Sequence, residues 1–124
     1  MTPASKLEPW QTWLVDFGQP IGHEEGWLRP ALVVGSTTHC TLRIEMALVV
    51  PLTTRDRRLP HHVRIASKSA GLRQVSWTRT EEINTVSTER FTRSLPLGAI
   101  SAEEIEELSL LLPAMLASSD GVAA

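Results

Sequence analysis

The sequence predicts a mainly β fold with a C-terminal α-helix. Through the first two thirds of the 124 residues, apolar residues alternate or run together in short blocks, as they do in strands. Only the last part of the chain repeats its apolar residues at a helical period. Because this length has room for one domain, we expect residues 1–124 to form a single small antiparallel barrel or sandwich, with its core over about 11–112.

Five segments have the pattern of strands, and each is bounded by turn residues. The first is followed by an acidic loop with Gly18, Pro20 and Gly22 that reaches Gly26. The third is a continuous apolar run, which predicts burial on both faces, although Pro51 within it suggests a bulge or a sheet edge. The expected strands are residues 11–17, 29–34, 47–53, 62–65 and 75–78, with a turn at Ala70 and Gly71 before the last.

A helix is expected to follow Ser101. Glu104 stands three residues later, which is the spacing of a capping box. A helical stripe then follows, made of Ile105, Leu108, Leu112 and Met115. The stripe suits packing on the sheet and a subunit interface equally well. Pro113 is expected to kink or shorten the helix, and residues 117–124 are expected to form a disordered tail.

Composition excludes several classes of protein. No run of about 18 apolar residues is present and the first residues lack the apolar core of a signal peptide, so we expect a cytoplasmic protein without a membrane span. The single cysteine, Cys40, excludes an intrachain disulfide and a zinc site built from cysteines. We expect Cys40 to be structural or solvent-facing.

Charge is unevenly distributed, although the formal net charge is only −2. Residues 1–28 carry one base and four acids, and residues 94–124 carry no base and five acids. Residues 29–93 carry eleven bases and five acids, hence +6. A local basic face of this kind attracts phosphate groups, although a charged surface without a ligand has the same composition.

Most large enzyme classes lack support, because no phosphate-binding glycine loop, metalloprotease helix or kinase signature is present. His61 and His62 are adjacent in a segment expected to be a strand, where neighbouring side chains point to opposite faces. A shared metal ion on this pair is therefore disfavoured, and we expect neither a metal nor a cofactor.

The segment from His23 to Val34 places an acid–base candidate, two carboxylates and the guanidinium of Arg29 at the entry of a strand. At this point the sequence resembles the MazF/PemK toxins of bacterial type II toxin–antitoxin systems. Further landmarks of that family follow in order over residues 11–112. The matching segments are residues 13–18 (WLVDFG), 22–24 (GHE), 29–34 (RPALVV), 50–54 (VPLTT), 59–63 (LPHHV), 71–76 and 81–91, the last resembling a late strand and a short helix.

The resemblance implies a small SH3-like barrel of the CcdB/MazF (PemK-like) type. It also implies a symmetric homodimer, a cognate MazE-like antitoxin, and a metal-independent endoribonuclease that cuts single-stranded RNA, mainly mRNA, sequence-selectively. The family's catalytic arginine and threonine match Arg29 and Thr53, with Thr54 as the alternative to Thr53. Attack of a ribose 2′-OH on the neighbouring phosphate builds negative charge that a guanidinium and a hydroxyl can stabilise, leaving 2′,3′-cyclic phosphate and 5′-OH ends.

Other residues are expected to contact RNA. The arginines of the loop after Thr53 suit phosphates, Trp27 can stack on an unpaired base, and a glutamate can accept from base amino groups. His23 is either a proton carrier or an RNA contact. The substrate-binding candidates are His23, Glu24, Trp27, Thr54, Arg55, Arg57, Arg58, Ser76 and Glu81, and Glu82 is considered with Glu81.

Two other functions stay open. A toxin of the CcdB type would poison DNA gyrase without cleaving RNA, and a catalytically silent barrel would bind RNA or an antitoxin only. The second is kept open by residues 9–11 (PWQ), where the family usually has arginine, glycine and an acid. Asn84 also replaces a common basic residue, which removes one expected phosphate contact.

Overall fold

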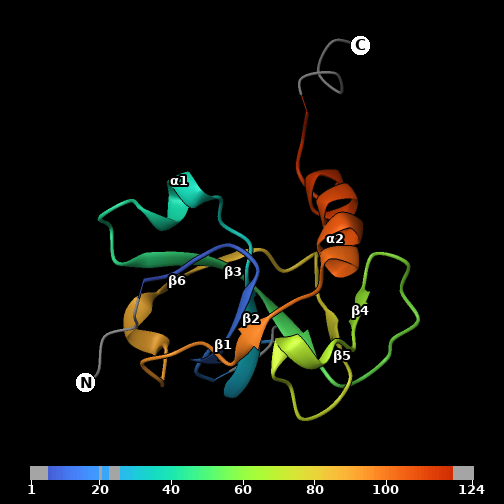
Figure 1. Cartoon of the computed structure of the whole chain (residues 1–124), viewed down its shortest axis with the longest axis horizontal. Coiled ribbons are helices and arrows are strands. Elements are labelled where there is room, and N and C mark those ends of the chain that lie inside the picture. The colour runs from blue at the N-terminus through green and yellow to red at the C-terminus, as the bar shows by residue number, and fades with distance from the viewer. Residues whose placement is uncertain (1–5, 20, 23–25, 119–124) are drawn as a thin grey trace.

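The computed structural model of the chain describes residues 6–19, 21–22 and 26–118, and Figure 1 shows their arrangement. Most elements are short strands, and a single longer helix follows them. In chain order the elements are β1 (Gln11–Asp16), β2 (Leu28–Val33), α1 (Thr37–Cys40), β3 (Met46–Thr53), β4 (Val63–Ile65), η1 (Lys68–Ala70), β5 (Ser76–Thr78), β6 (Asn84–Ser87), η2 (Thr88–Arg90), β7 (Gly98–Ala99) and α2 (Ala102–Ala114).

The strands form one antiparallel sheet in the order β4-β5-β3-β2-β1-β7, and β6 also pairs with β3. Strand β3 is the centre of this arrangement. Along one edge it pairs with β2, and along the other it pairs first with β6 and then with β5. Pro51 lies where β6 gives way to β5, inside the sheet. It does not mark a sheet edge, since it stands opposite Ala31 of β2 and its carbonyl accepts the backbone N–H of Arg79.

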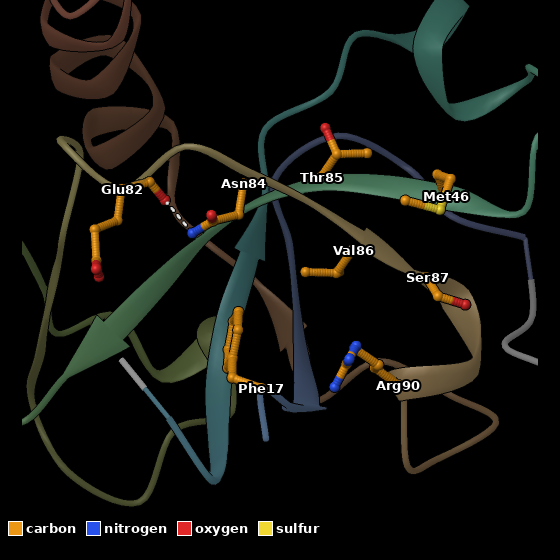
Figure 2. Close-up of a pocket in the computed structure, with 8 residues that line it drawn as sticks. All are labelled: Phe17, Met46, Glu82, Asn84, Thr85, Val86, Ser87 and Arg90. Carbon is orange, nitrogen blue, oxygen red and sulfur yellow. Dashed lines mark hydrogen bonds between the residues drawn. The ribbon is translucent and has the colours of Figure 1, made fainter. Parts of the chain in front are cut away.

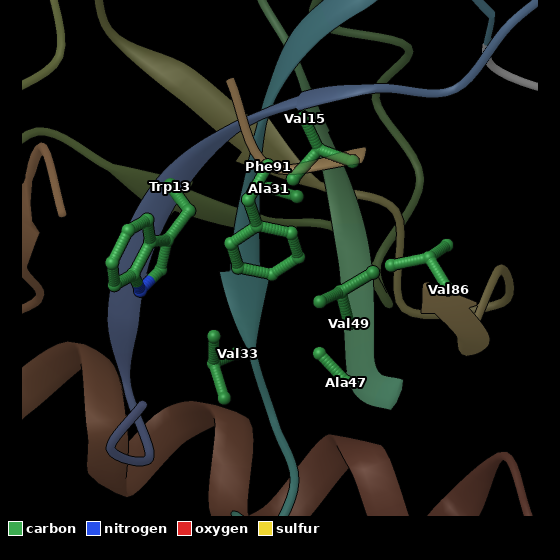
Figure 3. Close-up of a cluster of buried hydrophobic side chains, with 8 residues drawn as sticks. All are labelled: Trp13, Val15, Ala31, Val33, Ala47, Val49, Val86 and Phe91. Carbon is green, nitrogen blue, oxygen red and sulfur yellow. The ribbon is translucent and has the colours of Figure 1, made fainter. Parts of the chain in front are cut away.

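Two clusters of buried side chains lie on opposite sides of β3. Because side chains alternate along a strand, Ala47 and Val49 enter one cluster while Val50 and Leu52 enter the other. Figure 3 shows the first cluster, in which β1, β2 and β3 surround the ring of Phe91. The members of this cluster are Trp13, Val15, Ala31, Val33, Ala47, Val49, Val86 and Phe91.

Helix α2 covers the second cluster through Leu108, which is fully buried. The expected capping box is present: the Ser101 hydroxyl accepts the Glu104 backbone N–H, and the Glu104 carboxylate accepts the Ser101 backbone N–H. The helix ends one residue after Pro113, as expected for a shortened helix. Met115 lies outside the helix and is 37% exposed, so its expected place in the buried stripe is wrong.

The five expected strands are all present, each within one or two residues of its expected limits. The late strand and short helix implied by the family resemblance correspond to β6 and η2. Helix α1 and strand β7 were not expected, because four and two residues are too few to show a period. Among the described residues, no helix has both the length and the apolar character needed to cross a membrane.

Candidate active site

Arg29 and Thr53 lie at the adjoining ends of β2 and β3. In the antiparallel ladder between these strands, Ala31 stands opposite Pro51. Arg29 and Thr53 stand two residues beyond this pair, at the start of β2 and the end of β3. Strand pairing therefore brings two residues that are far apart in sequence to the same end of the β2–β3 ladder.

Both side chains are held by backbone groups. The half-buried Arg29 donates from Nε to the carbonyl oxygen of Gly26 at 3.0 Å, which positions its guanidinium against the loop before β2. Thr53 is only 5% exposed, and its Oγ1 accepts the backbone N–H of Arg55 at 3.1 Å. Since a hydroxyl can accept and donate at the same time, Thr53 can still donate to a phosphate oxygen.

Thr54, the alternative to Thr53, follows the last residue of β3 and lies in a bend. Alternation within β3 places Thr53 on the side of Val49. Thr54 is exposed and lines a cavity of about 470 Å³ together with Ser76 and Arg73. The buried Ser76 donates its hydroxyl to the Gln74 carbonyl at 3.1 Å. Arg29 and Thr53 are not among the described residues that line this cavity.

A second hollow lies beside the first core cluster (Figure 2), with a volume of about 410 Å³. Phe17 lines it, and its backbone N–H bonds to the Trp27 carbonyl at 2.8 Å, so Phe17 continues the β1–β2 ladder beyond the Val15–Arg29 and Asp16–Leu28 pairs. The hollow lies on the Thr53 side of the sheet, because Val86 belongs to the cluster that contains Val49. Its lining residues are Phe17, Met46, Glu82, Asn84, Thr85, Val86, Ser87 and Arg90.

Sequence reasoning did not identify Phe17 and Arg90 as residues of a hollow. Arg90 lies in η2 and donates from Nη1 to the Asp16 carbonyl at 3.2 Å, across 74 residues of sequence. Such a contact depends on tertiary structure and leaves no local signal. Asn84 was considered only as a lost phosphate contact, yet it lines the hollow and donates to the Glu82 carbonyl at 3.0 Å. The sequence signal that could have indicated Asn84 was a polar residue at the position where the late strand begins.

The remaining RNA-contact candidates are exposed. Trp27 is 61% exposed and has a φ of 63°, a conformation that only a few per cent of non-glycine residues adopt. Arg55, Arg57 and Arg58 are all exposed, and Arg58 also has a positive φ, of 55°. Its backbone N–H bonds to Asp56 Oδ1 at 2.8 Å, which holds the loop in a tight turn. His23 and Glu24 lie outside the described residues.

The expectation that His61 and His62 point to opposite faces is wrong. Both Nε2 atoms lie beside one oxygen of Glu81, at 3.1 Å from His61 and 2.8 Å from His62. The reason is local: these histidines lie in a turn before β4, where the His62 backbone N–H bonds to the Leu59 carbonyl, and strand alternation does not apply. Glu81 is therefore part of a histidine cluster as well as an RNA-contact candidate.

Glu81 is ionised at neutral pH. Burial acts to raise the pKa of its carboxyl group, but hydrogen bonds from its own backbone, from His62 and from Arg79 outweigh burial and lower that pKa. Arg79 is 6% exposed, and its Nε and Nη2 lie 3.2 Å from Glu81 Oε2. The two oxygens of this carboxylate thus have different partners.

Cys40 behaves as expected of a structural residue. It is partly buried against the first core cluster, and its thiol lies 3.6 Å from the Gly35 carbonyl. Burial raises the pKa of this thiol, and the nearby charge of Glu8 raises it further. A raised thiol pKa disfavours the nucleophilic thiolate.

A small antiparallel sheet with one C-terminal helix is the fold that this chain shares with MazF-type toxins. The chain belongs to the family described as the PemK-like, MazF-like toxin of type II toxin–antitoxin systems, whose model matches residues 8–116.

Individual relatives agree with this assignment. The chain is 31% identical to the endoribonuclease MazF9 of Mycobacterium tuberculosis H37Rv, over 79% of this chain and 86% of that protein. Its fold is similar to that of MazF from Deinococcus radiodurans, with a TM-score of 0.75 and 18% identity over 90% of this chain and 96% of that one. A mycobacterial endoribonuclease solved in complex with its cognate antitoxin gives a TM-score of 0.67 and 18% identity, over 89% and 92% of the two chains.

Proposed function

We propose that the chain is the endoribonuclease of a type II toxin–antitoxin system and that it cuts single-stranded RNA, mainly mRNA, sequence-selectively without a metal ion. The observation that supports this proposal is the pairing of β2 with β3, because Arg29 and Thr53 stand at the same end of that ladder, two residues beyond the Ala31–Pro51 pair. Membership of the toxin family and similarity to a relative named as an endoribonuclease support it.

In the proposed reaction, a ribose 2′-oxygen attacks the adjacent phosphorus and the bond from phosphorus to the 5′-oxygen breaks. The 2′-OH loses its proton and the leaving 5′-oxygen gains one, which leaves a 2′,3′-cyclic phosphate and a 5′-OH. Negative charge grows on the phosphoryl oxygens in the transition state. The Arg29 guanidinium and the Thr53 hydroxyl are suited to stabilise that charge.

Arg29 is assigned an electrostatic role, because a guanidinium group keeps its proton at neutral pH and transfers protons poorly. The imidazole of His23 is of a type suited to carry the proton between the 2′-OH and the leaving 5′-oxygen. Contact with RNA is the alternative role for His23. The exposed arginines of residues 54–58 are proposed to contact RNA phosphates, and Trp27 is proposed to stack on a base.

The proposed partners follow from the family. We propose a symmetric homodimer in the cytoplasm, silenced by a MazE-like antitoxin. An acidic, disordered segment of that antitoxin would fold over the basic groove and replace the charge of RNA. The mycobacterial structure of an endoribonuclease with its cognate antitoxin supports this kind of partner.

The proposal is tested by incubating a long end-labelled RNA with the purified chain and with two arginine variants. Arg29→Ala is expected to lower the cleavage rate at least about 100-fold, the usual cost of one lost donor to a developing oxyanion. Arg64→Ala removes an exposed guanidinium on β4 and is expected to leave the rate within about twofold. Intact RNA from a folded wild-type protein would favour the gyrase poison or the silent RNA-binding barrel instead.

A further inference from the structure

The two adjacent histidines and Glu81 come from two segments that the sheet brings together. Val63 of β4 pairs with Thr78 of β5, and the same register continued outward brings the residues before Val63 beside those after Thr78. The Thr80 hydroxyl donates to the His61 carbonyl at 2.6 Å. The Thr78 hydroxyl accepts the Val63 backbone N–H at 3.1 Å. The backbone that carries all three side chains is therefore fixed by strand pairing and by threonine hydrogen bonds.

The three side chains converge on one point. Two imidazole Nε2 atoms and one carboxylate oxygen all lie within 4.8 Å of one another. The two nitrogen–oxygen distances are 3.1 and 2.8 Å. In a tetrahedral site with metal–ligand bonds of about 2.0–2.1 Å, ligand atoms are about 3.3–3.4 Å apart. The nitrogen–oxygen distances are within a few tenths of an ångström of these values, and an ion draws the two nitrogens, which lie within 4.8 Å of each other, closer together.

Burial and charge also favour a cation here. The His62 side chain is 1% exposed and that of His61 is 26% exposed, so one ligand is enclosed while the other borders solvent. Arg79 is shared between Glu81 Oε2 at 3.2 Å and Glu82 Oε2 at 3.4 Å. The contact from Arg79 also orients Glu81 so that its other oxygen, Oε1, faces the histidines, as an outer partner does in known metal sites.

We propose that His61, His62 and Glu81 form a binding site for a divalent transition-metal ion of the zinc type. Two imidazoles and one carboxylate are the donors that zinc and its neighbours accept, whereas calcium and magnesium prefer oxygen ligands alone. The fourth position is left for water. The ion links the turn before β4 to the segment between β5 and β6. The site goes beyond the proposed function, since Arg29 and Thr53 are not among its ligands.

Titration calorimetry of tag-free, chelator-treated protein with Zn²⁺ tests this proposal, and Co²⁺ absorption reports the geometry. We expect one ion per chain with a dissociation constant in the micromolar range or below, and a tetrahedral Co²⁺ spectrum. His61→Gln and Glu81→Gln, two partly exposed positions, are each expected to weaken binding at least about tenfold. His39→Gln, in α1, is the matched control and is expected to bind as the wild type does.

Circular dichroism establishes that each variant is folded, and Glu81→Gln alone decides the question where His61→Gln does not fold. The proposal is overturned by the absence of saturable Zn²⁺ binding to the folded wild type. It is equally overturned by Zn²⁺ affinity in Glu81→Gln that matches the wild type, or by loss of binding in His39→Gln only.

Discussion

Thr53 and Thr54 are chemically identical neighbours, but Thr53 is the last residue of β3 and Thr54 lies in the bend that follows. Thr53 is 5% exposed and lies on the side that Arg29 shares, whereas Thr54 is exposed beside a different cavity. The position of a residue relative to the sheet, and not its type, therefore decides which of the two can act on the phosphate that Arg29 is proposed to contact.

Replacing each threonine by valine tests this assignment. Thr53→Val is expected to lower the RNA cleavage rate at least about 30-fold, since it removes a donor to the developing charge without changing side-chain shape. Thr54→Val is expected to stay within about threefold of the wild type. Single-turnover rates at saturating enzyme measure the difference. Equal rates for the two variants, or a larger loss in Thr54→Val, would contradict the assignment of Thr53.

The sequence predicted the positions of some site residues but not of others. Arg29 and Thr53 were identified through family landmarks, and their register agrees with a shared site. The convergence of His61 and His62 on Glu81 was missed, because it depends on a turn ending one residue later than expected and on a partner 19 residues away. Local alternation gives the wrong answer wherever a segment leaves the strand conformation.

At the scale of elements, two glycines with positive φ differ in what surrounds them. Gly71, at the end of η1, has a φ of 68°, and a Cβ built on it would lie 2.0 Å from the Leu97 carbonyl oxygen. Gly22 has a φ of 61°, and a Cβ there would meet no described atom within 4 Å. Both positions disfavour a side chain through the backbone, but only Gly71 does so through a backbone contact as well.

Alanine at each glycine separates the two effects. Gly71→Ala is expected to lower the free energy of unfolding by about 2–3 kcal/mol, and Gly22→Ala by about 1 kcal/mol, the cost of the left-handed conformation alone. Urea denaturation at equilibrium measures both values. A loss in Gly71→Ala no larger than that in Gly22→Ala would show that the close approach of Leu97 does not constrain the turn.

Glu104 joins the start of α2 to the segment after β4. Its carboxylate accepts the Ser67 hydroxyl at 2.6 Å, the Ala66 backbone N–H at 2.9 Å and the Ser101 backbone N–H at 2.9 Å. Burial acts to raise the pKa of Glu104, but the hydrogen bonds from Ser67, Ser101 and Ala66 outweigh burial and lower it. The ionised form therefore stabilises the folded state.

This shift predicts a pH-dependent stability. Because the pKa is lower in the folded state, the stabilisation is complete above the unfolded value of about 4.3 and is lost as pH falls through the folded value. Glu104→Gln is expected to cost about 1–3 kcal/mol at pH 7, and the difference from the wild type is expected to shrink below about pH 4. Denaturation at both pH values measures it, with the exposed Glu103→Gln as control. A pH-independent difference would contradict the account.

Long or strongly capped elements could be predicted from sequence, and very short ones could not. The capping box at Ser101 and Glu104 located the start of α2 to the residue. Met115 was misplaced because the helix ends at Ala114. Leu111, which the expected stripe did not include, packs against the second core cluster. Strand β7 consists of two residues held by pairing with β1, so its only signal is tertiary.

At the scale of the whole molecule, a net charge of −2 conceals a basic middle segment of +6 between acidic ends. The family, the fold and the exposed arginines of residues 54–58 together favour an RNA-binding surface on an otherwise acidic protein. The hollow bounded by Phe17 and Arg90 could not be predicted, because its lining joins the residue after β1 to residues of β3, β6 and η2.

The central claim is metal-independent RNA cleavage by 2′-OH attack, and cleavage of a long RNA in excess EDTA tests it most directly. The account predicts discrete cuts whose downstream fragments accept a kinase label without prior phosphatase treatment, because their 5′ ends are hydroxyls. Intact RNA in EDTA with cleavage restored by Mg²⁺, or fragments that carry 5′-phosphates, would contradict it.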